Sequence, residues 1–159
     1  MIGLWDYWMV GFLDFEIIKT RMRYGETTHK IIGCAMQVHN VLGSGFQEVI
    51  YQRALAIEME KQGLSYAREM SMDIFYDGHH IGTRRVDFFV EDTIMLELKA
   101  VANLDDNHLA QAMNYCQAYG LPIGLLINFG AKSLQYKRVY NINHPDNQNY
   151  KKPESPPKP

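Results

Sequence analysis

Apolar residues recur at helical spacing in three segments of the chain. In the first, the spacings are four, three and four residues, at Ile31, Ala35, Val38 and Leu42. Either Thr27 or Thr28 can cap the start of this helix, so the pattern predicts a helix over residues 27–42. The other two segments predict helices at 46–62, ended by Gly63, and at 105–119, ended by Gly120 and Pro122.

Alternating or continuous apolar runs predict strands between and after these helices. The dipeptide Asp77-Gly78 follows an alternating run and is a strong signal for a two-residue hairpin turn. The run Ile123–Phe129 is apolar except for Asn128, which is typical of a central strand buried on both faces. The predicted strands are 66–76, 80–90, 93–101 and 123–129, with 134–140 as a candidate edge strand.

The order of these elements, ααβββαβ, predicts a single α/β domain with a mixed central β-sheet flanked by helices. The composition agrees with this prediction. The chain has 159 residues, of which 47% are hydrophobic and 21% charged, and these values are ordinary for a globular domain. They exclude a largely disordered, collagenous or coiled-coil chain.

The apolar pattern also selects the register of the second hairpin. A three-residue loop over residues 91–93 brings the apolar residues of the two strands together on one side of the sheet, as the pairs Val90–Ile94, Phe88–Leu96 and Val86–Leu98. A slip of one residue would move this whole set to the other face. On the second face the same register pairs Asp87 with Glu97 and Arg85 with Lys99.

Two carboxylates on neighbouring strands form a hard oxygen site that suits Mg²⁺ or Mn²⁺. Lys99 follows Glu97 by two residues and therefore projects from the same face. A metal ion there would lower the pKa of a bound water, and the lysine would position that water or help to remove its proton. The alternative is an exposed set of cross-strand ion pairs, in which Asp87 and Glu97 face Arg85 and Lys99.

Polar residues on two of the helices add to this pattern. Glu48 lies at helical spacing from the apolar Tyr51 and Leu55, so we expect it to point with them toward the interior, where a carboxylate needs a partner. The alternative is a favourable acidic residue in the first turn of that helix. On the third helix a shared face carries His108, Gln111 and Tyr115, and the alternative there is an amphipathic surface stripe.

The net charge of −2 excludes a general polycation, so nucleic-acid binding would need a local basic patch. Candidates for phosphate contacts are Arg84, Arg85, Lys132, Lys137 and Arg138, which are alternatively the solvated faces of strands. The two cysteines, Cys34 and Cys116, are far apart and form no CxxC motif. We therefore expect reduced thiols and a cytoplasmic protein.

Both ends of the chain differ from its centre. The longest uncharged stretch near the start, Tyr7–Leu13, has seven residues, whereas a membrane span needs about 20, so we expect neither a span nor an export signal. Residues 1–21 are an N-terminal extension that we expect to lie outside the core, and Met22 is a candidate translation start. Residues 142–159 hold five of the six prolines and are expected to form a flexible tail.

Several of these residues resemble known motifs. The run Gly45-Phe46-Gln47-Glu48-Val49-Ile50-Tyr51 resembles the signature of the GxxExxY family of small prokaryotic proteins. Asp87 followed by Glu97-Leu98-Lys99 resembles the PD-(D/E)XK nuclease motif, although Val86 stands at the position of its proline. Gln111 and Tyr115 resemble the QxxxY motif of many such nucleases. The resemblance covers residues 22–141.

The resemblance implies a restriction-endonuclease-like fold and a magnesium- or manganese-dependent site. In that site Glu48, Asp87 and Glu97 would surround the metal ion and Lys99 would be catalytic. Gln111 would orient phosphate or water with support from Tyr115, and Tyr51 would also have a supporting role. His39 would either approach the metal or cap the first helix.

The leading hypothesis is metal-dependent hydrolysis of the phosphodiester bonds of DNA. A homodimer is a further expectation, because many nucleases cut two strands. The alternative is a non-catalytic module on the same fold that binds nucleic acid or protein. A third interpretation, a structural domain with surface ion pairs, predicts no binding of metal ions.

Overall fold

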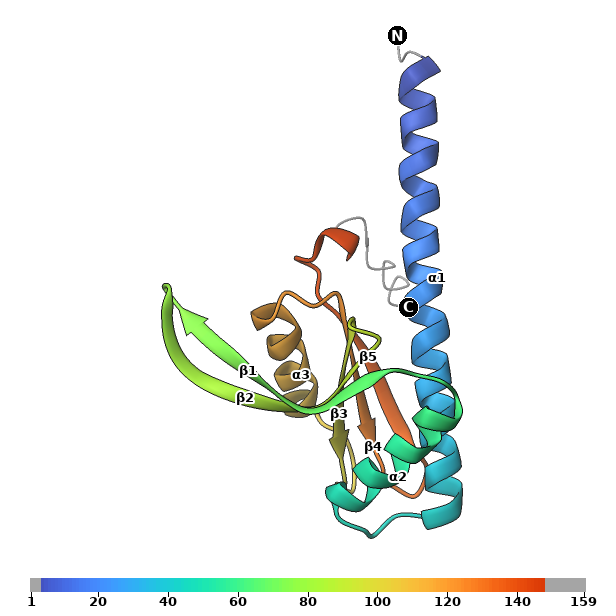
Figure 1. The fold of residues 1–159 in the computed structure, drawn as a ribbon, viewed down its shortest axis with the longest axis vertical. Coiled ribbons are helices and arrows are strands. Elements are labelled where there is room, and N and C mark those ends of the chain that lie inside the picture. The colour runs from blue at the N-terminus through green and yellow to red at the C-terminus, as the bar shows by residue number, and fades with distance from the viewer. Residues whose placement is uncertain (1–3, 148–159) are drawn as a thin grey trace, which may run out of the picture.

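The computed structural model describes the backbone of residues 4–147 and the side chains of residues 22 and 24–147. Within this range three α-helices and a five-stranded sheet follow one another in the predicted order (Figure 1). The elements are α1 (Leu4–Leu42), α2 (Glu48–Lys61), β1 (Tyr66–Tyr76), β2 (His79–Val90), β3 (Ile94–Lys99), α3 (Asp106–Ala118), β4 (Ile123–Asn128), β5 (Gln135–Tyr140) and a short 3₁₀ helix, Pro145–Asn147.

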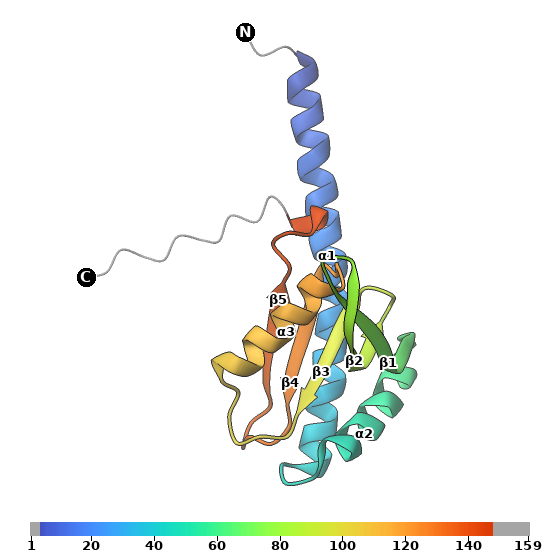
Figure 2. The ribbon, with the colours of Figure 1, turned by 90° about the vertical axis from the view of Figure 1, so that its left-hand side faces the viewer.

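Helix α1 begins much earlier than the sequence pattern predicted. The expected cap at Thr27 or Thr28 is wrong, because the helix is continuous from Leu4. The Thr28 hydroxyl donates instead to the Tyr24 carbonyl oxygen one turn back, at 2.8 Å, a bond that threonine makes within a helix. The N-terminal half of α1 extends beyond the rest of the described residues in both views (Figures 1 and 2).

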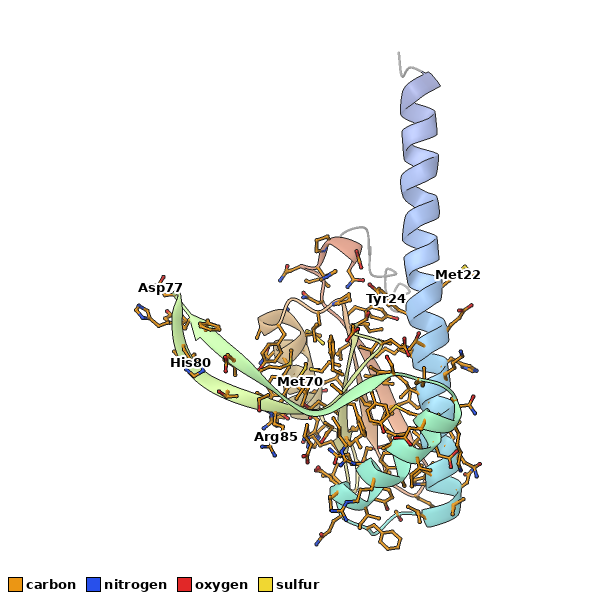
Figure 3. The ribbon with its side chains drawn as sticks, viewed as in Figure 1. Met22, Tyr24, Met70, Asp77, His80 and Arg85 are labelled. Carbon is orange, nitrogen blue, oxygen red and sulfur yellow. The ribbon has the colours of Figure 1, made fainter. Side chains whose placement is uncertain are left out.

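Among the residues of α1 whose side chains are described, packing against the domain starts at Tyr24. This side chain is only 5% exposed, whereas Met22 is 60% exposed and points away (Figure 3). At the other end, Asn147 is buried, and its side-chain amide donates to the Pro122 and Asn141 carbonyl oxygens. The packed chain therefore continues beyond the expected boundary at residue 141, and residues 148–159 of the expected tail lie outside the described residues.

A protein that begins at Met22 should fold as well as the full chain. The backbone of residues 4–21 extends away from the domain, so we expect the melting temperature to change by less than about 2 °C. Thermal unfolding of the two proteins under the same conditions measures this difference. A loss of several degrees, equivalent to about 1–2 kcal/mol, would show that residues 1–21 pack against the domain.

The sheet is mixed, as predicted. Its strand order is β1-β2-β3-β4-β5, and all neighbours are antiparallel except β3 and β4, which are parallel and connected through α3. Every residue of β4 is buried, which confirms the prediction of a central strand from its apolar run. β5 forms one edge of the sheet, as expected for residues 134–140.

The two predicted hairpin turns are present. Asp77 and Gly78 both have positive φ angles, 47° and 74°, as a two-residue turn between β1 and β2 requires. Val90 pairs with Ile94, so the loop between β2 and β3 contains the expected three residues. The pairing of Phe88 with Leu96 is also confirmed.

The predicted register does not continue to Val86 and Leu98. The β2–β3 ladder within the described residues ends at Phe88 and Leu96, and the Asp87 carboxylate accepts the hydrogen bond of the Leu98 amide at 2.7 Å. Beside this point β1 is distorted, with a φ of 54° at Glu69. Val86 consequently packs on the same side as Met95, not with Phe88 as alternation predicted.

The core lies on both faces of the sheet. Helix α3 covers one face and helices α1 and α2 cover the other (Figure 2). The larger cluster, between the sheet and α1 and α2, includes Ile31, Tyr51, Leu55, Phe88, Leu96 and Leu125. The smaller cluster, under α3, contains Val86, Met95, Ala112, Cys116, Leu126 and Val139. The sheet is thus covered on both sides, and the candidate site lies where its strands β2 and β3 diverge.

Candidate active site

The start of α2 is held by the side chain of Tyr51. Its hydroxyl donates to the Gly43 carbonyl oxygen at 2.6 Å and accepts from the Phe46 amide at 3.2 Å, while its ring stacks on Phe129 with a centroid separation of 4.6 Å. Gly45, between these two contacts, has a φ of 111°, which is strained for any residue with a side chain. The glycine and the tyrosine of the GxxExxY pattern therefore fix where α2 begins.

Glu48 is the first residue of α2, at the point that this turn determines. Its side chain is exposed, so the expectation that it points inward with Tyr51 and Leu55 is wrong. The other two residues are buried as expected. Glu48 is nevertheless close enough for its charge to raise the pKa of Glu97 on β3. The Glu48 carboxylate is therefore near Glu97 but is not buried.

Asp87 lies in β2 where the strand departs from β3, and both of its carboxylate oxygens have partners. One oxygen accepts from the Leu98 amide at 2.7 Å, and the other accepts from the Gln52 side-chain amide at 3.2 Å. Burial raises the pKa of Asp87, against the effects of the Leu98 amide, Lys99, Gln52 and Arg84. The two amide donors, of Leu98 and Gln52, hold the carboxylate in a fixed position and favour its charged form.

Glu97 is the most strongly perturbed acid of the site. It is only 4% exposed, and its Oε1 atom is buried without a hydrogen-bond partner among the described residues. Burial and the charges of Asp87 and Glu48 raise the pKa of Glu97 from 4.5 to about 7, against the opposing effects of Arg84 and Lys99. Asp87, Glu48 and Lys99 thus all lie close enough to Glu97 for their charges to act on it.

Two further residues of the site were not predicted in these roles. Gln52 is buried and donates to Asp87; its spacing of four residues from Glu48 was the available signal. Arg84 was expected only as a phosphate contact, yet its charge lowers the pKa of both Asp87 and Glu97. Strict alternation assigned Arg85 to this face, but Arg85 is exposed and points away from the domain (Figure 3).

Helix α3 contributes the side of the site opposite α2. Gln111 and Tyr115 are half-buried one turn apart, and the Arg84 guanidinium lies over the Tyr115 ring, 4.9 Å from its centroid. One turn further along, the Tyr119 hydroxyl donates to the Met72 carbonyl oxygen of β1 at 3.1 Å. These two contacts attach the base of the β1–β2 hairpin to α3.

Cys116 lies beneath the same face and takes no part in the chemistry proposed for the site. Burial, with a smaller contribution from Glu97, raises the pKa of its thiol to about 12. A thiol with this pKa is almost wholly protonated at neutral pH and is a poor nucleophile.

The remaining predicted residues are more scattered. A ring nitrogen of His39 lies 3.0 Å from the Ala131 carbonyl oxygen, which links α1 to the segment after β4 and favours a structural role for the histidine. Arg138 Nε donates to the Thr28 hydroxyl at 2.9 Å, so this arginine joins β5 to α1. Its neighbour Lys137 is exposed on the opposite face of β5, and Lys132 is exposed in the preceding loop. The five basic candidates therefore do not form one patch.

The carboxylate oxygens of the site fit a divalent cation, although the described side chains do not form a complete set of metal ligands. Within residues 22 and 24–147 no three His, Cys, Asp or Glu side chains are arranged to hold a metal ion. Asp87 and Glu97 are hard oxygen donors, and the buried Glu97 Oε1 has no other partner in that range. Burial and the repulsion from Asp87 raise the pKa of Glu97, and a bound cation would favour the charged form of the acid against both effects.

Comparison with known proteins decides the family. A sequence model of the PD-(D/E)XK nuclease superfamily matches residues 25–139, which is most of the chain and includes every residue of the site described above. The chain belongs to the PD-(D/E)XK nuclease superfamily. Its single α/β domain, with helices on both faces of a mixed sheet, has the restriction-endonuclease-like fold of that superfamily. The GxxExxY name itself remains a resemblance based on the motif alone.

Other comparisons add less to this superfamily assignment. A solved structure described as "Crystal structure of SSO0001" is similar at 15% sequence identity and a TM-score of 0.48, and the match covers 58% of this chain. The chain spans about half the length of that protein, because the match covers 50% of it. A search of curated proteins finds no match. Among the described residues, no helix has both the length and the apolar character that crossing a membrane requires.

Proposed function

We propose that this protein is a metal-dependent nuclease that hydrolyses phosphodiester bonds of DNA. The observation that carries the proposal is the buried, unpartnered Oε1 atom of Glu97 beside the carboxylate of Asp87. Two neighbouring carboxylates destabilise the folded protein when no cation compensates their charge. Such an arrangement is typical of sites that bind a cation. Membership of a nuclease superfamily supports the same conclusion.

Asp87 and Glu97 would hold the metal ion, with Glu48 completing the set from the start of α2. Mg²⁺ and Mn²⁺ both suit carboxylate ligands. When bound, such an ion activates a water molecule and neutralises charge on the phosphate. Gln52 would keep Asp87 ionised and correctly oriented, because its amide donates to the carboxylate from the side of α2.

Lys99 would orient the attacking water and stabilise the negative charge that develops on the phosphate. Its charge lowers the pKa of both Asp87 and Glu97, and this effect supports the proposed role. In the reaction the water loses a proton and its oxygen bonds to phosphorus, while the bond from phosphorus to the leaving sugar oxygen breaks and that oxygen takes up a proton. Gln111, half-buried on α3, would help to position the phosphate or the water.

The setting proposed for this reaction is the cytoplasm, where two free, buried cysteines remain reduced. DNA is the proposed partner, and a homodimer would allow the two strands of a duplex to be cut by two sites.

A cleavage assay tests the proposed function. The purified protein is incubated with linear duplex, circular duplex and single-stranded DNA, and with RNA, in Mg²⁺, in Mn²⁺ or in EDTA. We expect cleavage of at least one DNA substrate in the presence of a divalent ion and none in EDTA, and the Asp87→Asn variant should be inactive. DNA binding without cleavage under every condition would instead support a non-catalytic binding module.

A further inference from the structure

Arg84 occupies an unusual position in the candidate site. Among residues 22 and 24–147, the buried side-chain atoms without a hydrogen-bond partner are Arg84 Nε and Glu97 Oε1. One is a donor and the other an acceptor, and they belong to side chains that influence each other electrostatically. The two atoms are not bonded to each other. A ligand that gives both of them a partner would lie between or beside them.

The guanidinium group is held in place by an aromatic ring and not by an acid. It lies 4.9 Å from the centroid of the Tyr115 ring, a distance typical of a cation–π contact. No ion pair joins Arg84 to Asp87 or Glu97, within the part of the chain whose side chains are described. The positive charge therefore stands next to two carboxylates without being neutralised by direct contact with them.

The two unpartnered atoms suit ligands of opposite charge. The Glu97 oxygen suits a cation, whereas the Arg84 Nε–H can only donate and so suits an anion. A metal ion beside a phosphate oxygen satisfies both requirements at once. A planar guanidinium with several donors is also the side chain best suited to a phosphate group.

We infer that Arg84, positioned by Tyr115, binds a non-bridging oxygen of the phosphate that is cleaved. This inference rests on the proposed function and adds a specific phosphate-binding residue to it. Arg84 thus stabilises charge on the reacting group, and Tyr115 is a positioning residue that acts through Arg84. The attachment of Tyr119 to Met72 holds the same part of the hairpin against α3 and so supports the placement of the arginine.

Cleavage kinetics of matched variants test this inference. Arg84→Gln should lower kcat by about 100-fold, the loss typical of removing one donor to developing charge. Arg84→Lys keeps the charge but not the planar donors, and we expect a loss of about tenfold or more. The matched control is Arg68→Gln, which alters an exposed arginine of the same hairpin and should change kcat by less than about twofold. Equal kcat values for the parent and both Arg84 variants would overturn the inference.

A double-mutant cycle separates positioning from simple packing. Tyr115→Leu should lower kcat by about tenfold, whereas Tyr115→Phe keeps the ring face and should retain most of the activity. In the Arg84→Gln background, Tyr115→Leu should have almost no further effect. If the two losses multiply instead, Tyr115 does not act through Arg84.

A measurement without cleavage makes the inference independent of the nuclease assay. The ¹⁵N-labelled Nε–H resonance of Arg84 is assigned from its disappearance in Arg84→Lys, and spectra are recorded with Mg²⁺ alone and with Mg²⁺ and inorganic phosphate. We expect a shift that needs phosphate, and none for Arg68. A shift with Mg²⁺ that does not change further when phosphate is added would show that Arg84 serves only as the counter-ion of Glu97. A protein that cleaves no nucleic acid but shows the phosphate-dependent shift would refute the proposed function and keep the phosphate site.

Discussion

Lys99→Ala should reduce DNA cleavage by about 100-fold or more without weakening the binding of Mg²⁺. The side chain is half-buried next to the two carboxylates proposed to hold the ion, and its positive charge opposes that of a cation. Its removal therefore leaves the affinity for Mg²⁺ unchanged or higher. The chemical step loses a group positioned on the water or on the developing charge, which accounts for the size of the effect.

The two quantities are measured separately, by calorimetric titration with Mg²⁺ and by cleavage rates at saturating Mg²⁺. Both are measured at pH 8.5, because Lys99 lowers the pKa of Glu97 and its loss would otherwise leave more of this acid protonated. Lys61→Ala is the control, since Lys61 is exposed at the end of α2 and pairs with Glu58 at 2.7 Å. DNA binding should survive both changes. Cleavage by Lys99→Ala at the parent rate would refute the mechanism while leaving the fold intact.

Glu97→Gln should abolish cleavage and, in EDTA, make the folded protein more stable above pH 7. The folded protein holds the Glu97 proton up to a pKa of about 7, whereas the unfolded chain releases it near 4.5. The stability of the parent therefore falls as the pH rises from about 4.5 to about 7, by roughly 3 kcal/mol. Glutamine keeps the shape without the charge, so the variant avoids this loss.

Thermal unfolding in EDTA at pH 5 and pH 8.5 measures the effect. We expect the variant to melt roughly 10 °C above the parent at pH 8.5, and the difference to shrink toward pH 5. Added Mg²⁺ should stabilise the parent but have little effect on the variant. Glu26→Gln, at an exposed position of α1, is the control and should change neither property. A variant that is less stable than the parent at pH 8.5 would contradict the proposed burial of an uncompensated charge.

Much of the fold could be predicted from local pattern. The apolar run of β4, the turn at Asp77-Gly78 and the loop of residues 91–93 were all identified because each depends on residues close together in sequence. The start of α1 was not, since threonine can cap a helix or bond back within one, and only the structure shows which of these Thr28 does.

The candidate site was also predicted only in part. The pairs Val90–Ile94 and Phe88–Leu96 were predicted correctly, because the register near a short loop is set by the burial of apolar neighbours. The prediction failed beyond Phe88, where the strands diverge and the Asp87 side chain takes the place of a backbone partner. Strict alternation assumes a regular strand without a distortion. It therefore assigned Arg85 to the site in place of Arg84.

The sequence by itself determined the order of the elements and the mixed sheet, and it predicted the acidic pair with its lysine. These follow from periodicity and turn chemistry, in which each residue depends on neighbours a few positions away. Only the tertiary structure decided that Glu48 is exposed, that Gln52 supports Asp87 and that Arg84 lies on Tyr115. Each of these contacts joins elements distant in the chain, and depends on how far the β1–β2 hairpin twists and where α2 and α3 pack, which no local pattern encodes.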